Sequence, residues 1–229
     1  MAPLWRHQAS ALTFVLLLSS GCVQRVRGPH GIEGGRVADG FFYVVPVEGG
    51  VVLVDTGEQP DGAALRDAIA GRPVLALLVT HAHHDHYAAA HTFGEVPCHV
   101  GPDDIDRMQG KTQHQGEAQR AFREQNGGQD LRPPLPARLV PAPDGTQLVF
   151  GGDTFTALAL PGHTPGSTAW TFRDGLFGGD AAMASGGGIA PIDARFSDDP
   201  QAATEVVRRL DGRSFSWLAD GHVGLTLLR

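Results

Sequence analysis

Four histidines and one aspartate stand within six consecutive residues, in the run Thr80-His81-Ala82-His83-His84-Asp85-His86. This run directly follows an apolar stretch, residues 74–79, which predicts a buried strand. In α/β proteins, ligand-binding residues commonly gather where the chain leaves the end of a strand. The alternative, a solvated polar loop with chance histidines, explains neither the density of the histidines nor the preceding strand. The run therefore predicts a metal site at the end of a strand.

The spacing of these side chains indicates their local geometry. A helical zinc motif such as H-E-x-x-H is excluded, because residues two apart on a helix do not share a face. In an extended segment, alternate side chains lie on the same side. We therefore expect His81, His83 and Asp85 to converge while His86 points elsewhere, so that one segment supplies two adjacent metal positions.

Three further candidate ligands occur downstream, each after a predicted strand. His163 lies in the segment 160–167, in which Pro165 and Gly166 suit the centre of a tight turn. Asp180 closes the short apolar run 176–179, and His222 follows the strand-like residues 214–218. If these strands deliver their ends to one edge, all of the candidate ligands meet there.

In these motifs the chain resembles the metallo-β-lactamase fold superfamily of hydrolases, from about Gly34 to its last residue. The family's motifs fall on the following residues: H-x-H-x-D-H on His81, His83, Asp85 and His86, G-H-T-P-G on residues 162–166, the bridging aspartate on Asp180, and the last histidine on His222. The segment 53–57 resembles the family's buried aspartate turn, which supports the metal loop from behind. The resemblance implies an α/β fold, an αββα sandwich of two mixed β-sheets flanked by helices, formed by a single domain over residues 34–229.

The resemblance also implies a ligand set for two divalent metal ions. His81, His83 and His163 would bind the first ion, Asp85, His86 and His222 the second, and Asp180 would bridge both. Zinc is the default for such nitrogen and oxygen ligands, and iron or manganese would also be accommodated.

The activity implied by the resemblance is that of a dinuclear hydrolase. A metal-bridging hydroxide would cleave an ester, thioester, lactone or related acyl bond, and Asp85 would guide its proton as the catalytic residue. The glyoxalase II-like and lactonase-like branches have the closest ligand pattern, because Asp180 is present. Two alternatives stay open: an exported class B-like β-lactamase, and a non-hydrolytic protein, either a mononuclear iron persulfide oxygenase or a metal-holding module.

The charge of the chain indicates which classes of partner it can bind. A net charge of −7 and a single lysine, Lys111, argue against binding of nucleic acid, which needs a basic face. The two metal ions would keep the site itself net positive, so we expect a small substrate that contains a carbonyl group or is anionic.

The first 22 residues predict a signal peptide. Arg6 and His7 precede an apolar run, residues 11–18, which is too short to span a bilayer. Ser19-Ser20-Gly21-Cys22 resembles a bacterial lipoprotein cleavage box. We expect export to the periplasm or the outer membrane, membrane attachment through lipid on Cys22, and a linker over residues 23–33. Ordinary signal cleavage and a retained anchor are the alternatives.

The remaining pattern predicts the other elements and the pocket rim. We expect a hairpin of residues 41–47 and 51–55, helices over 61–70, 116–125 and 199–210, strand pairs over 147–160 and 168–177, and a flexible glycine loop at 185–188. Long segments at 101–138 and 183–197 would rim the pocket and place Met108, Phe122, Met183 and Ile189 near substrate. His30, His91, His99 and His114 match no ligand position and are expected on the surface or in the core. Cys98 is expected to be a buried, inert thiol, and Tyr87 either faces substrate or packs under the metal loop.

Overall fold

The computed structural model describes residues 23–229. The predicted signal peptide, residues 1–22, and the lipidation of Cys22 lie outside the described residues and stay predictions. Among the residues described, no helix combines the length and the apolar character needed to cross a membrane.

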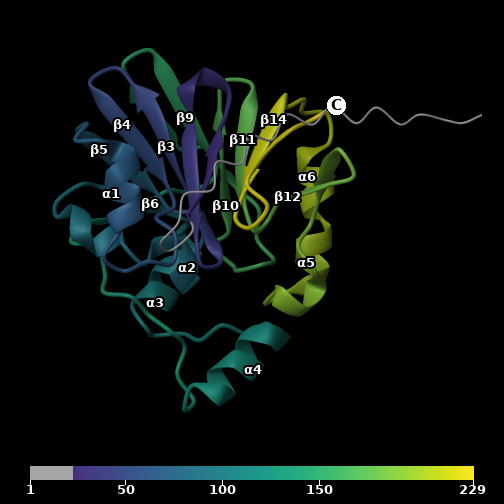
Figure 1. The fold of residues 1–229 in the computed structure, drawn as a ribbon. Helices are drawn as coiled ribbons and strands as arrows, with labels where there is room; N and C mark the ends of the chain where they lie inside the picture. Colours follow the sequence, from purple (N-terminus) through teal and green to yellow (C-terminus); the bar gives the residue numbers. More distant parts are fainter. Residues whose placement is uncertain (1–22) are drawn as a thin grey trace, which may run out of the picture.

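Two mixed β-sheets form the centre of the domain (Figure 1). The first sheet has seven strands in sequence order, β1 (Gln24–Arg27), β2 (Glu33–Val37), β3 (Gly40–Val47), β4 (Gly50–Val54), β5 (Val74–Leu78), β6 (Cys98–Val100) and β7 (Leu139–Pro141). The second has six strands in the order β15 (Leu225–Leu227), β14 (Trp217–Asp220), β11 (Gly175–Gly179), β10 (Thr168–Phe172), β9 (Asp153–Ala159) and β8 (Gln147–Phe150).

Short helices cover the outer faces and the connections. The α-helices are α1 (Ala63–Ile69), α2 (His84–Tyr87), α3 (Ile105–Met108), α4 (Glu117–Gln125), α5 (Pro200–Thr204) and α6 (Val206–Leu210). The 3₁₀ helices are η1 (Pro29–Gly31), η2 (Ala90–Phe93), η3 (Pro102–Asp104) and η4 (Ala194–Phe196). The hairpin of β12 (Met183–Ser185) and β13 (Gly188–Ala190) forms a separate two-stranded sheet.

The alternation of side chains along the strands produces the layers. In β3, Phe41, Tyr43 and Val45 face the second sheet, where they join a core that includes Trp170 and Phe177. The residues between them, Phe42 and Val44, pack on the opposite face with α1. The outer face of the second sheet packs against α6. Both faces of β3 are therefore buried, which explains its nearly continuous apolar sequence. The expected αββα sandwich is confirmed.

Several predicted elements differ from the structure in their details. Residues 24–27, placed in the predicted linker, form the edge strand β1 paired with β2. The single helix expected at 199–210 is divided at Glu205 into α5 and α6. The glycine loop expected at 185–188 is the turn of the β12–β13 hairpin, with Gly186 and Gly187 at positive φ. Only β1 forms by pairing with residues that the prediction had placed in another segment, whereas the β12–β13 hairpin forms by local pairing.

Strand direction brings the predicted ligands to one edge of the sandwich. β9 and β11 each pair antiparallel with β10, and β11 pairs parallel with β14, so these three strands run in one direction. The loops after β9, β11 and β14 carry His163, Asp180 and His222, while the loop after β5 carries the histidine-rich run. The carboxyl ends of these strands, which belong to both sheets, therefore meet around one centre.

Candidate metal centre

The first group of side chains consists of three histidines whose ring nitrogens face one another. His81 Nε2 lies 3.0 Å from His83 Nδ1, and His163 Nε2 lies 3.0 Å from the former and 2.8 Å from the latter. All three rings are buried. Burial lowers the pKa of each imidazole, so these rings are neutral and present lone pairs to the space between them.

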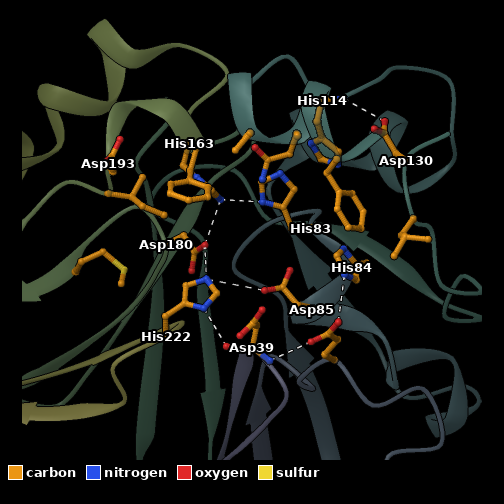
Figure 2. A pocket seen from close by; sticks show the side chains of 18 residues that line it. Asp39, His83, His84, Asp85, His114, Asp130, His163, Asp180, Asp193 and His222 are labelled. Atoms are coloured by element: carbon orange, nitrogen blue, oxygen red, sulfur yellow. Dashed lines mark hydrogen bonds and ion pairs between the residues drawn. The ribbon is translucent and has the colours of Figure 1, made fainter. Parts of the chain in front are cut away.

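A second group adjoins the first and consists of Asp85, His86 and His222. Asp85 Oδ2 lies 3.4 Å from His86 Nε2 and 3.9 Å from His222 Nε2. Within each group the candidate ligand atoms all lie within 4.8 Å of one another. Figure 2 shows His83, His163, Asp180, Asp85 and His222 pointing toward a common centre.

Asp180 lies between the two groups. Its Oδ2 is 3.4 Å from His163 Nε2 and 2.9 Å from His222 Nε2, and its Oδ1 is 3.4 Å from His86 Nε2. One carboxylate therefore reaches ligand atoms of both groups, as a bridging residue must. Asp180 is buried and directly follows β11, which fixes its position.

The short helix α2 decides which group Asp85 joins. The expectation that Asp85 converges with His81 and His83 is wrong, because the chain leaves the extended conformation at His84 and turns into α2. The turn directs Asp85 and His86 to the same side, toward His222. The resulting grouping matches the one that the family resemblance implies.

The charges and the unpaired polar atoms of this cluster fit metal ions. Although burial alone lowers the pKa of His86, the carboxylates of Asp85, Asp180 and Asp55 raise it well above its usual value. His86 Nε2 and Asp180 Oδ1 are buried without a hydrogen-bond partner. Buried polar atoms are rarely left unpaired. A cation between His86 Nε2 and Asp180 Oδ1 would pair both atoms, and the surrounding carboxylates would stabilise its charge.

Asp55, the predicted supporting aspartate, holds the cluster from behind. It follows β4 in a left-handed conformation with φ of 55°. Its carboxylate accepts hydrogen bonds from Thr80 N at 2.7 Å and Thr80 Oγ1 at 2.7 Å, and Oδ2 lies 2.8 Å from His86 Nδ1. Asp55 thereby orients the His86 ring so that Nε2 faces the centre.

A second buried carboxylate, Asp104, connects the two ligand-bearing loops of the first group. It accepts hydrogen bonds from Ala82 N at 2.8 Å, Thr164 Oγ1 at 2.7 Å and Gly166 N at 2.9 Å. Asp104 was not among the site residues predicted from the sequence. The available signal was its position shortly after the strand β6, at the same edge as the other ligands.

The cluster lies at the base of a cavity of about 630 Å³. His84, Phe122 and Met183 line it, as does His114, which was expected on the surface or in the core and instead packs on His83 with ring centroids 4.2 Å apart. Met108 and Ile189 do not line the cavity, so their predicted place near substrate is wrong. Met108 is buried in the hydrophobic core on the outer face of the first sheet. Ile189 packs against the hydrophobic core on the outer face of the second sheet.

Tyr87, Cys98 and the remaining histidines belong to neither ligand group. Tyr87 is fully buried in the core beneath the metal loop, which resolves its two predicted positions in favour of packing. His99 is buried, whereas His30 lies near Asp174 and His91 lies near Ala88 O. Cys98 is buried in β6.

Comparison with known proteins identifies the broader group. Residues 35–216 match the family model described as the metallo-beta-lactamase superfamily. The Bacillus subtilis (strain 168) protein YobT, described as uncharacterized, is 28% identical over 200 residues, which cover 79% of this chain and 81% of YobT. A crystal structure of TTHA1623 in a di-iron-bound form is 29% identical, with a TM-score of 0.58 over 94% of each chain.

A hydroxyacylglutathione hydrolase of Vibrio cholerae serotype O1 (strain ATCC 39541 / Classical Ogawa 395 / O395) is a more partial match. It is 31% identical over 117 residues, which cover 49% of this chain and 35% of the hydrolase. The matched region therefore spans about a third of that relative's length.

Proposed function

This chain belongs to the metallo-β-lactamase superfamily of metal-dependent hydrolases, and on that premise we propose that it cleaves an ester, thioester, lactone or related acyl bond with two metal ions. The observation that carries the proposal is the pair of adjoining ligand groups with Asp180 between them. A complete second group favours a dinuclear hydrolase over a mononuclear iron oxygenase or a metal-holding module.

The residues present fit two divalent ions. His81, His83 and His163 would hold one ion, Asp85, His86 and His222 the other, and Asp180 both. We propose zinc, because it is the usual metal of such nitrogen and oxygen ligands. The ring nitrogens of the first group, separated by 2.8–3.0 Å, are close enough together to bind one ion. The di-iron form of TTHA1623 makes iron the metal to test beside zinc.

When bound, the two ions would polarise a substrate carbonyl and lower the pKa of water so that hydroxide is available at neutral pH. The carboxylates of Asp85 and Asp180 offset two of the four positive charges that two divalent ions bring. The remaining positive charge would stabilise negative charge that develops on a carbonyl oxygen.

The protein side chains hold the metal ligands in place and transfer a proton. Asp85 is almost fully buried but lines the cavity, so its carboxylate is able to accept the proton of the attacking water and pass it toward the leaving group. Asp55 and Asp104 hold the ligands in place through His86, Ala82 and Thr164. The similarity to hydroxyacylglutathione hydrolase supports an acyl bond as the target, although it covers only half of this chain.

Metal analysis followed by a hydrolysis screen tests the proposal. The purified protein should contain close to two metal ions, and Asp180→Ala and His222→Ala should each reduce this to about one. His30→Ala, which removes a histidine outside both groups, should leave the stoichiometry unchanged and serves as the control. The two-metal protein should then hydrolyse a thioester, lactone or ester.

Two results would contradict the proposal. A single iron ion in the intact protein would support the alternative function of a mononuclear iron oxygenase instead. Cleavage of β-lactams without cleavage of the other acyl bonds would establish the β-lactamase alternative.

A further inference from the structure

We infer that the substrate presents an apolar, uncharged or cationic group to the cavity and carries no carboxylate there, an inference that rests on the proposed acyl hydrolase function. It concerns the walls of the cavity above the ligand cluster. These walls include the segment 114–131, which contains α4, and the segment 183–196, which ends in η4.

Apolar side chains from both segments form part of these walls. They are Ala118, Phe122 and Leu131 in the first segment and Met183, Ile192 and Phe196 in the second. Phe122 is 39% exposed, Leu131 44% and Phe196 39%, so each keeps a large apolar surface in contact with solvent. An apolar group of a ligand placed between the two segments would remove this surface from water, which is favourable.

The charged side chains of the walls are acidic. Asp39, Glu58, Asp130 and Asp193 line the cavity outside the ligand cluster. Across residues 23–229, no lysine or arginine lines it. A carboxylate of a substrate would therefore find no lysine or arginine to pair with on the described cavity wall.

Three of the aspartates that line the cavity are paired with arginines. Arg36 pairs with Asp39, Arg123 with Asp130 and Arg195 with Asp193, each at 3.0 Å. All three of these aspartates line the cavity, whereas the arginines do not. The arrangement presents carboxylate oxygens, and not guanidinium groups, to a bound molecule.

Two backbone amides next to the start of α4 are also occupied. Gln115 N and Gly116 N donate to Asp198 Oδ1 at 2.6 and 2.8 Å. Helix N-termini often bind anionic groups, but a carboxylate of the protein already takes these two amides. An anionic substituent would therefore find neither a lysine or arginine on the described cavity wall nor these two amides to pair with.

Substrates that differ only at one end test the inference. On whichever acyl bond the enzyme cleaves, chains of equal length would end in methyl, trimethylammonium or carboxylate. We expect kcat/KM for the carboxylate compound to be at least tenfold below that of the methyl compound, and the trimethylammonium compound to stay within a fewfold of it. A carboxylate compound cleaved as well as the methyl compound would overturn the inference while leaving the proposed hydrolase function intact.

Substitution of the apolar wall gives a second measure. Phe122→Ala and Phe196→Ala should raise KM about tenfold for an octanoyl substrate and leave that for an acetyl substrate nearly unchanged. Both side chains are partly exposed, so folding should be preserved. Val149→Ala, a change at an exposed apolar residue outside the cavity, is the matched control. Equal effects on both substrates would contradict the inference.

A binding measurement separates this inference from the proposed function. If the two-metal protein cleaves no acyl bond, the proposed function fails, but the cavity is still testable by NMR with 1-heptanol and heptyltrimethylammonium. Both should perturb the signals of residues 118–131 and 192–196 in the wild type and much less in Phe122→Ala. No perturbation by either compound would overturn the inference.

Discussion

Asp55 Oδ2 lies 2.8 Å from His86 Nδ1, on the side of the imidazole opposite to the candidate metal centre. Both residues are buried, and Thr80 donates two further hydrogen bonds to the same carboxylate. This contact fixes which nitrogen of His86 faces the centre.

We therefore expect Asp55→Asn to weaken metal binding at the group of Asp85, His86 and His222. Loss of such a supporting partner commonly reduces metal affinity about 10- to 100-fold. Competition with a chelator measures this affinity, and Asp67→Asn, a change at an exposed position on α1, is the control. Equal affinities of the two variants would show that the Asp55–His86 contact does not support metal binding.

Asp104→Asn should destabilise the protein and weaken binding at the group of His81, His83 and His163. The buried carboxylate accepts three hydrogen bonds, and a carboxamide would direct its NH₂ group toward one of these donors. Leaving a buried polar group unpaired costs about 1–3 kcal/mol. Thermal unfolding and zinc competition measure both effects. The neighbouring exposed Asp103→Asn should change neither, and similar behaviour of the two variants would contradict the prediction.

Asp85→Asn should reduce kcat on every substrate of the enzyme. The change weakens a ligand of the second group and removes the proposed proton acceptor, and loss of proton transfer alone costs about 10²–10⁴-fold. Assays at saturating zinc, with bound metal measured in parallel, separate the two effects. Near-normal turnover in this variant would exclude Asp85 from the catalytic step.

The Cys98 thiol should be unreactive in the native protein. Burial raises its pKa to about 12 from 9.0, so almost no thiolate forms at pH 8. In a Cys22→Ser background, Cys98 is the remaining cysteine of the two in the sequence, and a thiol reagent should label it only on unfolding. Rapid labelling at pH 8 without unfolding would disprove its burial.

The same shift predicts a dependence of stability on pH. The unfolded chain loses the thiol proton above pH 9 whereas the native protein retains it up to about pH 12, so stability falls as pH rises through this interval. From pH 8 to pH 10 the free energy of unfolding of the wild type should fall by about 1 kcal/mol more than that of Cys98→Ala. Denaturant unfolding at both pH values measures the difference, and parallel curves for the two proteins would contradict it.

Much of the fold and of the candidate site could be predicted because its signals are local. The apolar stretch before Thr80 indicates a buried strand, and the order of histidines and aspartates along the chain carries the family resemblance. Short apolar runs before His163, Asp180 and His222 likewise mark the strands that these residues follow. Because these motifs are local, they carry the family resemblance that implies the sandwich and the seven ligand residues at its edge.

Only the tertiary structure shows how the path of the chain produces the two ligand groups and what surrounds them. Asp85 joins His222 because α2 begins at His84, and Tyr87 at the end of α2 is buried in the core. Asp104 reaches Ala82 and Thr164 across 22 and 60 residues of sequence. The acidic, arginine-free lining of the cavity likewise results from ion pairs such as Arg123–Asp130, whose orientation no spacing predicts. Such contacts arise only when distant segments pack together, because their geometry is a property of the assembled fold and not of any stretch of the chain.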